Sequence, residues 1–330
     1  MQKTAITLLN YQTKNFNHSF FSRIDAISIE IWEDLDCENN RYFHRNFLKS
    51  VEKNHPEIDF YYQILFDTNK KACAIFSIQI IDFEINSIKN NFRLLIKKIQ
   101  KVTNKIPFLP SSRPFKILIV GNTFISGEHG FFIKETLDKK LVLKEFSKAI
   151  LQFSNSQSQL QIDAILCKDF KYESLSSTSV FEKFQFKRFS VEPNLVMEIN
   201  ENWKNFNDYL SALKTKFRVK AKKALQQSSE LKLVEISPEN CEHQLIKMTE
   251  LYQKVSSNAG FNLANFNVAT YKDLKRAFGE NYLLQSYWID EKMVGFLSGL
   301  ITNNSLDAHF VGIDYSLNKQ YAIYQRTLYD

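Results

Sequence analysis

The sequence is poor in the residues and patterns that mark several common protein classes. Its four cysteines lie far apart and form no Cys-x-x-Cys pair, which disfavours both a disulfide framework and a zinc site. No apolar run approaches the roughly 18 residues of a transmembrane helix. Residues 1–15 lack a long apolar core and a small-residue cleavage site, so we expect no signal peptide. These absences favour a cytoplasmic protein with reduced thiols.

Two kinds of catalytic site are disfavoured in the same way. No Gly-x-Ser-x-Gly elbow is present, so a Ser-His-Asp hydrolase has no support. The six histidines show no metal-ligand spacing, and we therefore predict no metal site.

Glycine is also scarce, yet three of the eight glycines lie in residues 121–131, GNTFISGEHGF. Such a cluster indicates a backbone that needs positive φ angles or a close approach to another group. Glu128 and His129 lie inside it and are candidates for lining a cleft between domains. The simpler interpretation is that both residues stand at the tip of a hairpin.

The overall composition is that of a soluble globular protein, with 44% hydrophobic and 24% charged residues. The net charge is +7. A basic balance of this size fits an acidic partner, such as tRNA, an acyl carrier protein, a nucleotide or an anionic membrane. A solvated, lysine-rich surface would explain it equally well.

Hydrophobic periodicity divides the chain into two mixed α and β regions, residues 1–198 and 199–330, each long enough for its own core. Residues 60–66 and 72–81 predict a half-buried hairpin. Further predicted strands cover residues 116–120, 162–167, 194–199 and 231–236. Predicted helices cover residues 41–54, 86–105, 141–153, 205–224, 241–256 and 270–278.

Two of these helices are strongly basic. Residues 86–105 form an amphipathic pattern without an acidic residue, which suits a membrane surface or a carrier protein. The second basic helix carries Lys216, Arg218, Lys220 and Lys223, which we predict to bind substrate or phosphate. A solvated helix face is the alternative. Aromatic residues do not alternate with these lysines, which disfavours nucleic acids other than a tRNA donor.

The last fifty residues give the clearest pattern. Residues 283–289, 293–302 and 306–313 predict three strands joined by tight turns at 290–292 and 303–305. A loop at 314–319 and a helix at 320–329 follow. The sequence therefore predicts an antiparallel meander that leads into a helix.

Several segments resemble the Fem-type branch of the GNAT acyltransferase superfamily, whose founders add amino acids to peptidoglycan precursors. The main match is NWKNFNDYLSALKTKFRVKAKKA at 202–224, where a Trp-x-x-Phe-x-x-Tyr-Leu start precedes a Lys/Arg-rich helix. FHRNFLKSVE at 43–52, GFLSGLI at 295–301 and AHFVGIDY at 308–315 are similar too. The chain looks most like the FemAB-like peptidoglycan biosynthesis or recognition proteins.

The resemblance implies an α+β fold with two tandem GNAT-like domains, a degenerate one at 1–198 and a donor-binding one at 199–330. It implies acyl or aminoacyl transfer to an amine of a cell-envelope lipid or peptidoglycan precursor, without a metal or a resident cofactor. The acyl donor, a co-substrate, is acyl-CoA, an acyl carrier protein or aminoacyl-tRNA. We expect a cytoplasmic enzyme, with attachment to the inner face of the cytoplasmic membrane left open. The alternative is a non-catalytic GNAT scaffold that binds an anionic lipid or envelope precursor.

In such a domain the third meander strand and the next helix hold the donor, with its phosphates at the helix N-terminus. We expect this helix to begin near Lys319, so that Lys319 and Gln320 contact phosphate. The usual glycine-rich phosphate loop is absent, and residues 314–320 replace it. A GNAT domain also needs a further strand beyond this helix. We therefore expect a domain that is truncated at its C-terminus, unless another segment covers the strand edge.

Four residues are candidates for catalysis. Asp307 and His309 are two apart on a predicted strand and so face the same side, with His309 as base and Asp307 beside it. A sheet-surface pair or a core histidine is the alternative. Asp314 and Tyr315 follow the strand end, where ligands commonly bind.

Overall fold

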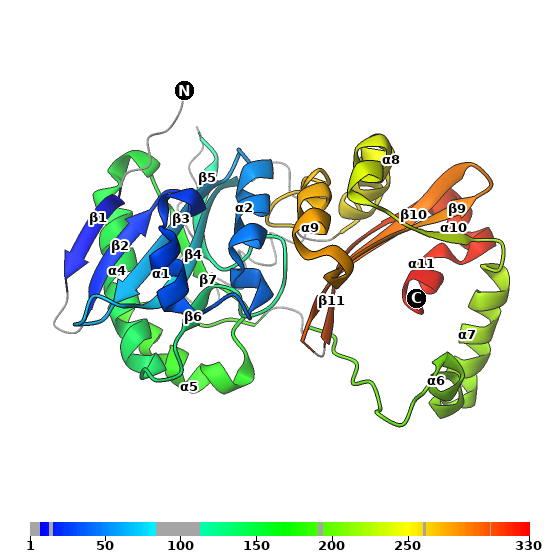
Figure 1. Cartoon of the computed structure of the whole chain (residues 1–330), viewed down its shortest axis with the longest axis horizontal. Coiled ribbons are helices and arrows are strands. Elements are labelled where there is room, and N and C mark those ends of the chain that lie inside the picture. Colours follow the sequence, from blue (N-terminus) through cyan, green and yellow to red (C-terminus); the bar gives the residue numbers. More distant parts are fainter. Residues whose placement is uncertain (1–6, 13–15, 84–112, 191–193, 260–261, 304) are drawn as a thin grey trace. The chain divides into compact units, whose positions relative to one another are not determined.

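Alternating apolar residues and short turns form two separate β-sheets, each covered by helices (Figure 1). The computed structural model describes residues 7–12, 16–83, 113–190, 194–259, 262–303 and 305–330. Unit 1 comprises residues 1–192 and 260–266, and unit 2 comprises residues 193–259 and 267–330. The mixed α and β fold class is thus confirmed. The return of residues 260–266 to unit 1 has no signal in the sequence.

The sheet of unit 1 has seven strands in the order β1-β2-β3-β4-β5-β7, with β6 paired to β4. Its strands are β1 (Thr7–Gln12), β2 (Asn17–Phe21), β3 (Asp59–Phe66), β4 (Ala72–Phe83), β5 (Phe115–Val120), β6 (Phe131–Ile133) and β7 (Ala164–Cys167). Its helices are α1 (Ile29–Leu35), α2 (Arg45–Asn54), α4 (Lys139–Ser156) and α5 (Leu175–Thr178). The β5–β7 pair is parallel and the other pairs are antiparallel.

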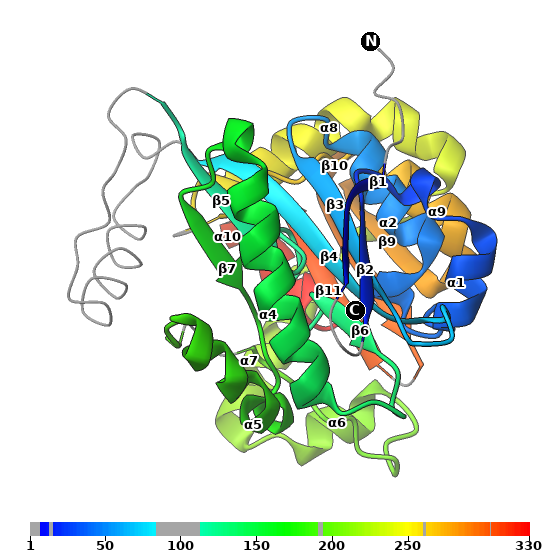
Figure 2. The ribbon, with the colours of Figure 1, turned by 90° about the vertical axis from the view of Figure 1, so that its left-hand side faces the viewer.

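The central hairpin of unit 1 is more buried than its sequence pattern predicts. Neighbouring strand residues point to opposite faces, yet Ile75 and Phe76 are both fully buried. Helix α4 covers one face of the sheet, and α1 and α2 cover the other (Figures 1 and 2). The predicted hairpin is confirmed as the antiparallel pair of β3 and β4, but its predicted half burial is wrong, because apolar residues of β4 pack on both faces.

Helix α4 forms because a cap and an apolar stripe agree. The Asp138 carboxylate accepts hydrogen bonds from the backbone N–H groups of Lys140 and Leu141. Two turns apart, α4 then presents aromatic rings to the sheet: Phe146 stacks on Phe76 at 3.9 Å between centroids, and Phe153 on Phe20 at 4.6 Å. These rings form much of the core of unit 1.

The sheet of unit 2 is an antiparallel meander in the order β11-β10-β9-β8. Its strands are β8 (Lys232–Glu235), β9 (Tyr282–Ile289), β10 (Lys292–Thr302) and β11 (Ser305–Ile313). Its helices are α6 (Phe206–Ala212), α7 (Thr215–Gln227), α8 (Pro238–Ser256), α9 (Thr270–Phe278), α10 (Tyr315–Tyr321) and α11 (Ile323–Thr327). Helices α8 and α9 lie on one face of this sheet, and α10 and α11 on the other (Figure 1).

Three predicted elements of unit 2 differ in the structure. Residues 194–199 form no strand, and their apolar side chains are largely exposed, with Leu195 at 98%. The predicted helix 205–224 is two helices, because α6 ends at Ala212 and α7 begins at Thr215. The predicted helix 320–329 begins earlier, since α10 starts at Tyr315. The capping box of Asn205 and Asp208 is present.

Two expectations concern a membrane. Within the described ranges, no helix is both long and apolar enough to span a bilayer. The predicted basic helix 86–105 lies outside the described residues.

Close packing beneath β11 gives a test of the core of unit 2. A Cβ at Gly312 would lie 2.1 Å from Cε1 of Phe296 and 2.8 Å from Cβ of Leu251. We expect Gly312→Ala to lower the free energy of unfolding by about 1–3 kcal/mol, because the buried ring must move. Denaturant unfolding measures this change.

Gly299→Ala is the matched control. Its new methyl group would meet the side-chain end of Leu306 at 2.9 Å and the Asp307 carbonyl at 3.0 Å. Leu306 is half exposed and can turn aside, so the loss should be smaller. A larger loss for Gly299→Ala than for Gly312→Ala would contradict this account of the packing.

Candidate functional site

The end of β11 opens into a pocket of about 400 Å³ within unit 2. Three elements and the residues after α8 contribute to it: α8, the start of β10 and the start of α10. Its lining residues are Lys247, Glu250, Lys254, Ser257, Asn258, Lys292, Asp314, Tyr315 and Ser316. Two of the predicted site residues, Asp314 and Tyr315, are among them.

Asp314 holds the strand and the helix of this pocket together. Its backbone N–H donates to the Val294 carbonyl of β10 at 2.9 Å, which continues the sheet ladder. Its carboxylate caps α10 by accepting from the backbone N–H of Ser316 at 3.2 Å and from the Ser316 hydroxyl at 2.6 Å. The side chain is only 7% exposed. Asp314 is thus fixed by groups on both sides of the strand–helix junction.

Lysines surround this buried carboxylate. The Lys292 ammonium lies 3.1 Å from Oδ2 of Asp314, and that of Lys254 lies 3.9 Å from Oδ1. Glu250 joins the network by pairing with Lys247 and Lys254, each at 2.8 Å. Three lysines against two carboxylates leave one excess positive charge, so the pocket favours an anion.

The electrostatics of the pocket decide which role Asp314 can play. Burial raises the pKa of Asp314, but the hydrogen bond from Ser316 and the charges of Lys292 and Lys254 outweigh it and lower the pKa to about 2. A carboxylate with so low a pKa is a weak base at neutral pH. The surroundings therefore suit Asp314 to positioning rather than to proton abstraction.

The predicted phosphate contacts at Lys319 and Gln320 depend on a helix that begins near Lys319, and in the structure this helix begins earlier. Because α10 begins at Tyr315, Lys319 and Gln320 lie in its last turns, where the helix dipole favours cations. Neither residue lines the pocket. Tyr315 and Ser316 occupy the first turn instead, and Tyr315 is half exposed.

His309 and Asp307 lie upstream on β11. Nδ1 of His309 is 3.5 Å from the hydroxyl of Tyr282, a fully buried residue of β9. Neither His309 nor Asp307 lines the Asp314 pocket. At about 3.3 Å per residue, His309 stands roughly 16 Å along the strand from Asp314.

The four predicted cations of α7 differ in their contacts, and their predicted binding role stays a prediction. The Arg218 guanidinium donates to the carbonyls of Ser211 and Leu213 at 3.1 and 3.3 Å, and so satisfies the C-terminal end of α6. Lys216, Lys220 and Lys223 are exposed. None of these four residues lines the pocket.

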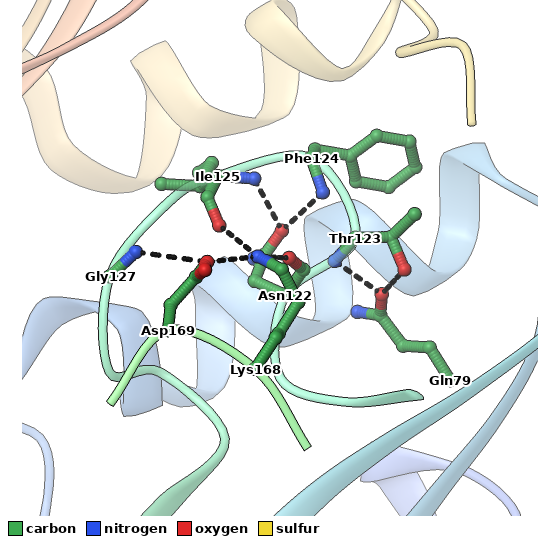
Figure 3. A network of polar contacts seen from close by, with 8 residues as sticks. All are labelled: Gln79, Asn122, Thr123, Phe124, Ile125, Gly127, Lys168 and Asp169. Atoms are coloured by element: carbon green, nitrogen blue, oxygen red, sulfur yellow. Dashed lines mark hydrogen bonds and ion pairs between the residues drawn. The ribbon is translucent and has the colours of Figure 1, made fainter. Parts of the chain in front are cut away.

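The glycine-rich segment of unit 1 forms an ordered loop that the chain itself fills (Figure 3). The Lys168 ammonium donates to the carbonyls of Asn122 and Ile125 at 2.9 and 3.1 Å and pairs with Asp169. Gly121 has a φ of +148°, and a Cβ there would lie 2.6 Å from Cγ of Lys168. The glycine is therefore required by the close approach of Lys168.

Glu128 and His129 are held within this same part of unit 1. Glu128 accepts from the Lys139 ammonium at 3.0 Å, the Ser174 hydroxyl at 2.9 Å and the backbone N–H of Lys171 at 3.0 Å. The ring of His129 lies 3.8 Å from that of Tyr42. These contacts indicate that Glu128 and His129 stabilise unit 1, and their predicted role in a cleft stays a prediction.

Sequence reasoning missed the lysines of the pocket. Lys247 and Lys254 lie seven residues apart on α8, two helical turns, so they share a face with Glu250. Lys292 is the first residue of β10. The spacing of Lys247, Glu250 and Lys254 on α8 could have been noticed in the sequence. Nothing in the sequence, however, connects these residues to Asp314. Within the described residues no cluster of histidine, cysteine and carboxylate side chains could hold a metal.

No family model and no curated protein matches this chain. Among solved structures, FemX is similar with 13% identity and a TM-score of 0.36, covering 76% of this chain and 51% of the FemX chain. A mutant of the BH1408 protein from Bacillus halodurans is similar with 11% identity and a TM-score of 0.30, covering 52% of this chain and 97% of that one. This chain thus spans about half the FemX chain. Likenesses at this level establish neither a shared fold nor a shared activity.

Asp314 variants test the electrostatics of the pocket. We expect Asp314→Ala to lower the free energy of unfolding by about 1–2 kcal/mol through loss of the cap, and Asp314→Asn to lower it less because asparagine also caps helices. The folded pKa is depressed, so the charge of Asp314 stabilises the fold above about pH 4 and ceases to do so as pH falls through about 2. Unfolding measured across this pH range should show the gap between wild type and Asp314→Asn closing in acid. An equal gap near pH 2 and pH 7 would refute the lysine pairing.

Lys168 gives a test in unit 1. We expect Lys168→Met to cost about 1–3 kcal/mol, because the Asn122 and Ile125 carbonyls and the Asp169 carboxylate lose their donor. The matched control is Lys171→Met, an exposed lysine on the same segment, which should change stability by less than about 0.5 kcal/mol. Guanidinium unfolding of both variants measures this, and equal effects would argue against a filled loop.

Proposed function

We propose that unit 2 is the catalytic half of an N-acyltransferase of the Fem-type GNAT branch. In this proposal an anionic acyl donor binds at the Asp314 pocket, and its acyl or aminoacyl group passes to the amine of a cell-envelope lipid or peptidoglycan precursor. The observation that carries the proposal is the junction of β11 and α10, where a sheet strand ends in a lysine-rich pocket.

The order of elements in unit 2 supports this proposal. A strand, two helices, three meander strands and a helix follow one another as β8-α8-α9-β9-β10-β11-α10. The resemblance to GNAT domains implies this order, with the donor at the third meander strand and the helix after it. The same resemblance implies a similar unit 1, whose strand β5, helix α4 and parallel strand β7 would form its counterpart. There the Lys168 side chain occupies the loop after β5, which agrees with a degenerate first domain.

The charges of the pocket support an anionic donor. Lys247, Lys254 and Lys292 are between 30% and 54% exposed, so their ammonium groups can turn toward an incoming phosphate. Asp314 stays ionised and holds Lys292 and Lys254, while Glu250 holds Lys247. Charge-assisted hydrogen bonds from several lysines would then hold the donor.

The position of β11 restricts the donor's shape. Among the described strands β11 is at one end of the sheet, so one row of its backbone N–H and C=O groups faces away from β10. A donor with phosphate at Asp314 would have to extend roughly 16 Å along β11 to bring its acyl group to His309. A long, flexible donor such as acyl-CoA or the arm of an acyl carrier protein fits this requirement. His309 would then take the proton from the attacking amine, with Asp307 on the same strand beside it.

Purified protein offered acyl-CoA, acyl carrier protein and aminoacyl-tRNA with a panel of amines tests this proposal. Amide formation is followed by mass spectrometry. We expect Lys292→Ala or Lys247→Ala to raise KM for the donor about tenfold, because each removes one charge-assisted contact. Lys272→Ala is the control, since this lysine of α9 pairs with Glu242 and does not line the pocket.

His309→Ala distinguishes catalysis from binding alone. Loss of turnover with unchanged donor affinity would support its role as base. Donor binding without turnover in the wild type would instead indicate a non-catalytic binding scaffold. Absence of transfer and of binding with every donor would reject the proposal.

A further inference from the structure

Helix α7 presents a basic surface that the Asp314 site does not use. The helix buries Ala221 and Ala224. Its solvent-exposed surface carries Lys216, Val219, Lys220 and Lys223, whose spacing of three, four and seven residues places them in one stripe. All four are exposed, and Val219 is 60% exposed. This stripe is called the α7 face below.

The lysines of the α7 face differ from those of the pocket. Each pocket lysine pairs with Glu250 or Asp314. Among the described residues, no carboxylate lies within ion-pairing distance of Lys216, Lys220 or Lys223. No acidic residue occurs between positions 213 and 229 either. A helix that needed only solubility would usually carry both signs of charge. The α7 face therefore keeps its full positive potential.

Apolar side chains lie among these charges. Val219 stands between Lys216 and Lys223 on the same stripe, whereas Phe217, which is 51% exposed, lies toward the side of Ala221 and Ala224. On α6, which packs beside α7, Phe206 is 36% exposed. Lysines around exposed apolar residues are typical of helices that lie in the headgroup region of a bilayer.

Other acidic partners fit this surface less well. Arginine is the usual bidentate partner of nucleic-acid phosphates and bases, whereas the arginine of α7, Arg218, is turned toward the end of α6. A stable interface with a folded acidic protein needs a broad, largely apolar centre, whereas the apolar part of the α7 face is the single residue Val219. The ammonium groups of Lys216, Lys220 and Lys223 around Val219 suit a partner whose negative charge is spread over a surface.

We propose that the α7 face docks on an anionic lipid surface, with Lys216, Lys220 and Lys223 at the headgroups and Val219 inserted between them. Each lysine near such a surface strengthens binding by about fivefold, so three together contribute about a hundredfold. Salt weakens this attraction, because the Debye length falls from about 10 Å at 0.1 M to about 3 Å at 1 M. The proposal rests on this surface and not on acyl transfer.

Vesicle sedimentation with the full chain tests the proposal. The vesicles are phosphatidylcholine alone, or phosphatidylcholine with about a third phosphatidylglycerol. We expect binding to the anionic vesicles only, and a loss of about a hundredfold when Lys216, Lys220 and Lys223 are all changed to Gln. Val219→Ser should weaken binding several-fold without changing the charge.

The matched control changes three exposed lysines of unit 1, Lys140, Lys144 and Lys183, to Gln. This variant has the same net charge as the α7 variant, and its binding should stay within about twofold of wild type. Equal losses in both triple variants would show that total charge, not the α7 face, governs binding, and would overturn the proposal.

Two further results would also overturn it. One is wild-type protein that binds no anionic vesicle, and the other is binding of RNA or an acidic carrier protein through the same three lysines without vesicle binding. The assay contains no acyl donor, so its outcome is independent of whether transfer occurs. A thermal melt of each variant confirms that the exposed substitutions leave the fold intact.

Discussion

The buried carboxylate of Asp314 is the interaction on which the candidate site depends. It caps α10 through Ser316, while the backbone of the same residue continues the ladder between β10 and β11. A carboxylate in this position must remain charged in a place that water scarcely reaches. Lys292 and Lys254 stabilise the buried negative charge, and these two lysines also make the strand–helix junction a basic pocket.

The loop of unit 1 also surrounds a poorly exposed charge, but there the central charge is positive. Lys168 is a poorly exposed ammonium, and the carbonyls of Asn122 and Ile125 together with Asp169 satisfy it. Here the stabilising groups converge on the Lys168 side chain, which occupies the position where a ligand cation would otherwise be held. In unit 2 the lysines are the outer groups, and they surround an open space of about 400 Å³. In the filled loop a lysine is at the centre, whereas in the candidate pocket a carboxylate is at the centre and lysines surround it.

The parts of this fold that follow from local sequence were predictable. The turns at 290–292 and 303–305 fixed the meander, and Asn205 with Asp208 fixed the start of α6. The break between α6 and α7 was not predictable, because the apolar pattern continues through it while Arg218 satisfies the end of α6 from the next helix. Residues 194–199 have strand-forming side chains, but a strand needs a partner, and propensity says nothing about where one lies.

Only those residues of the candidate site that directly follow β11 were predictable. Asp314 and Tyr315 could be found because they follow a strand end. Their lysines come from α8 and from the start of β10, between 22 and 67 residues before Asp314, and only folding brings them together. The predicted start of the helix near Lys319 was wrong because Asp314 was assigned to a loop instead of to the cap position. A capping aspartate five residues earlier moves the helix N-terminus, and with it every contact expected there.

Two groups of lysines in unit 2 differ in their surroundings. Lysines of the pocket are paired with Glu250 and Asp314, so most of their charge is neutralised nearby. Lysines of the α7 face have no such carboxylates among the described residues, and their potential extends into solvent. Pairing lowers the long-range field but fixes geometry, which suits the orientation of a bound donor. Leaving lysines unpaired gives up geometric precision but preserves long-range attraction, which suits a diffuse surface. In our two proposals the same residue type thus serves two kinds of recognition, and the carboxylates of Glu250 and Asp314 separate them.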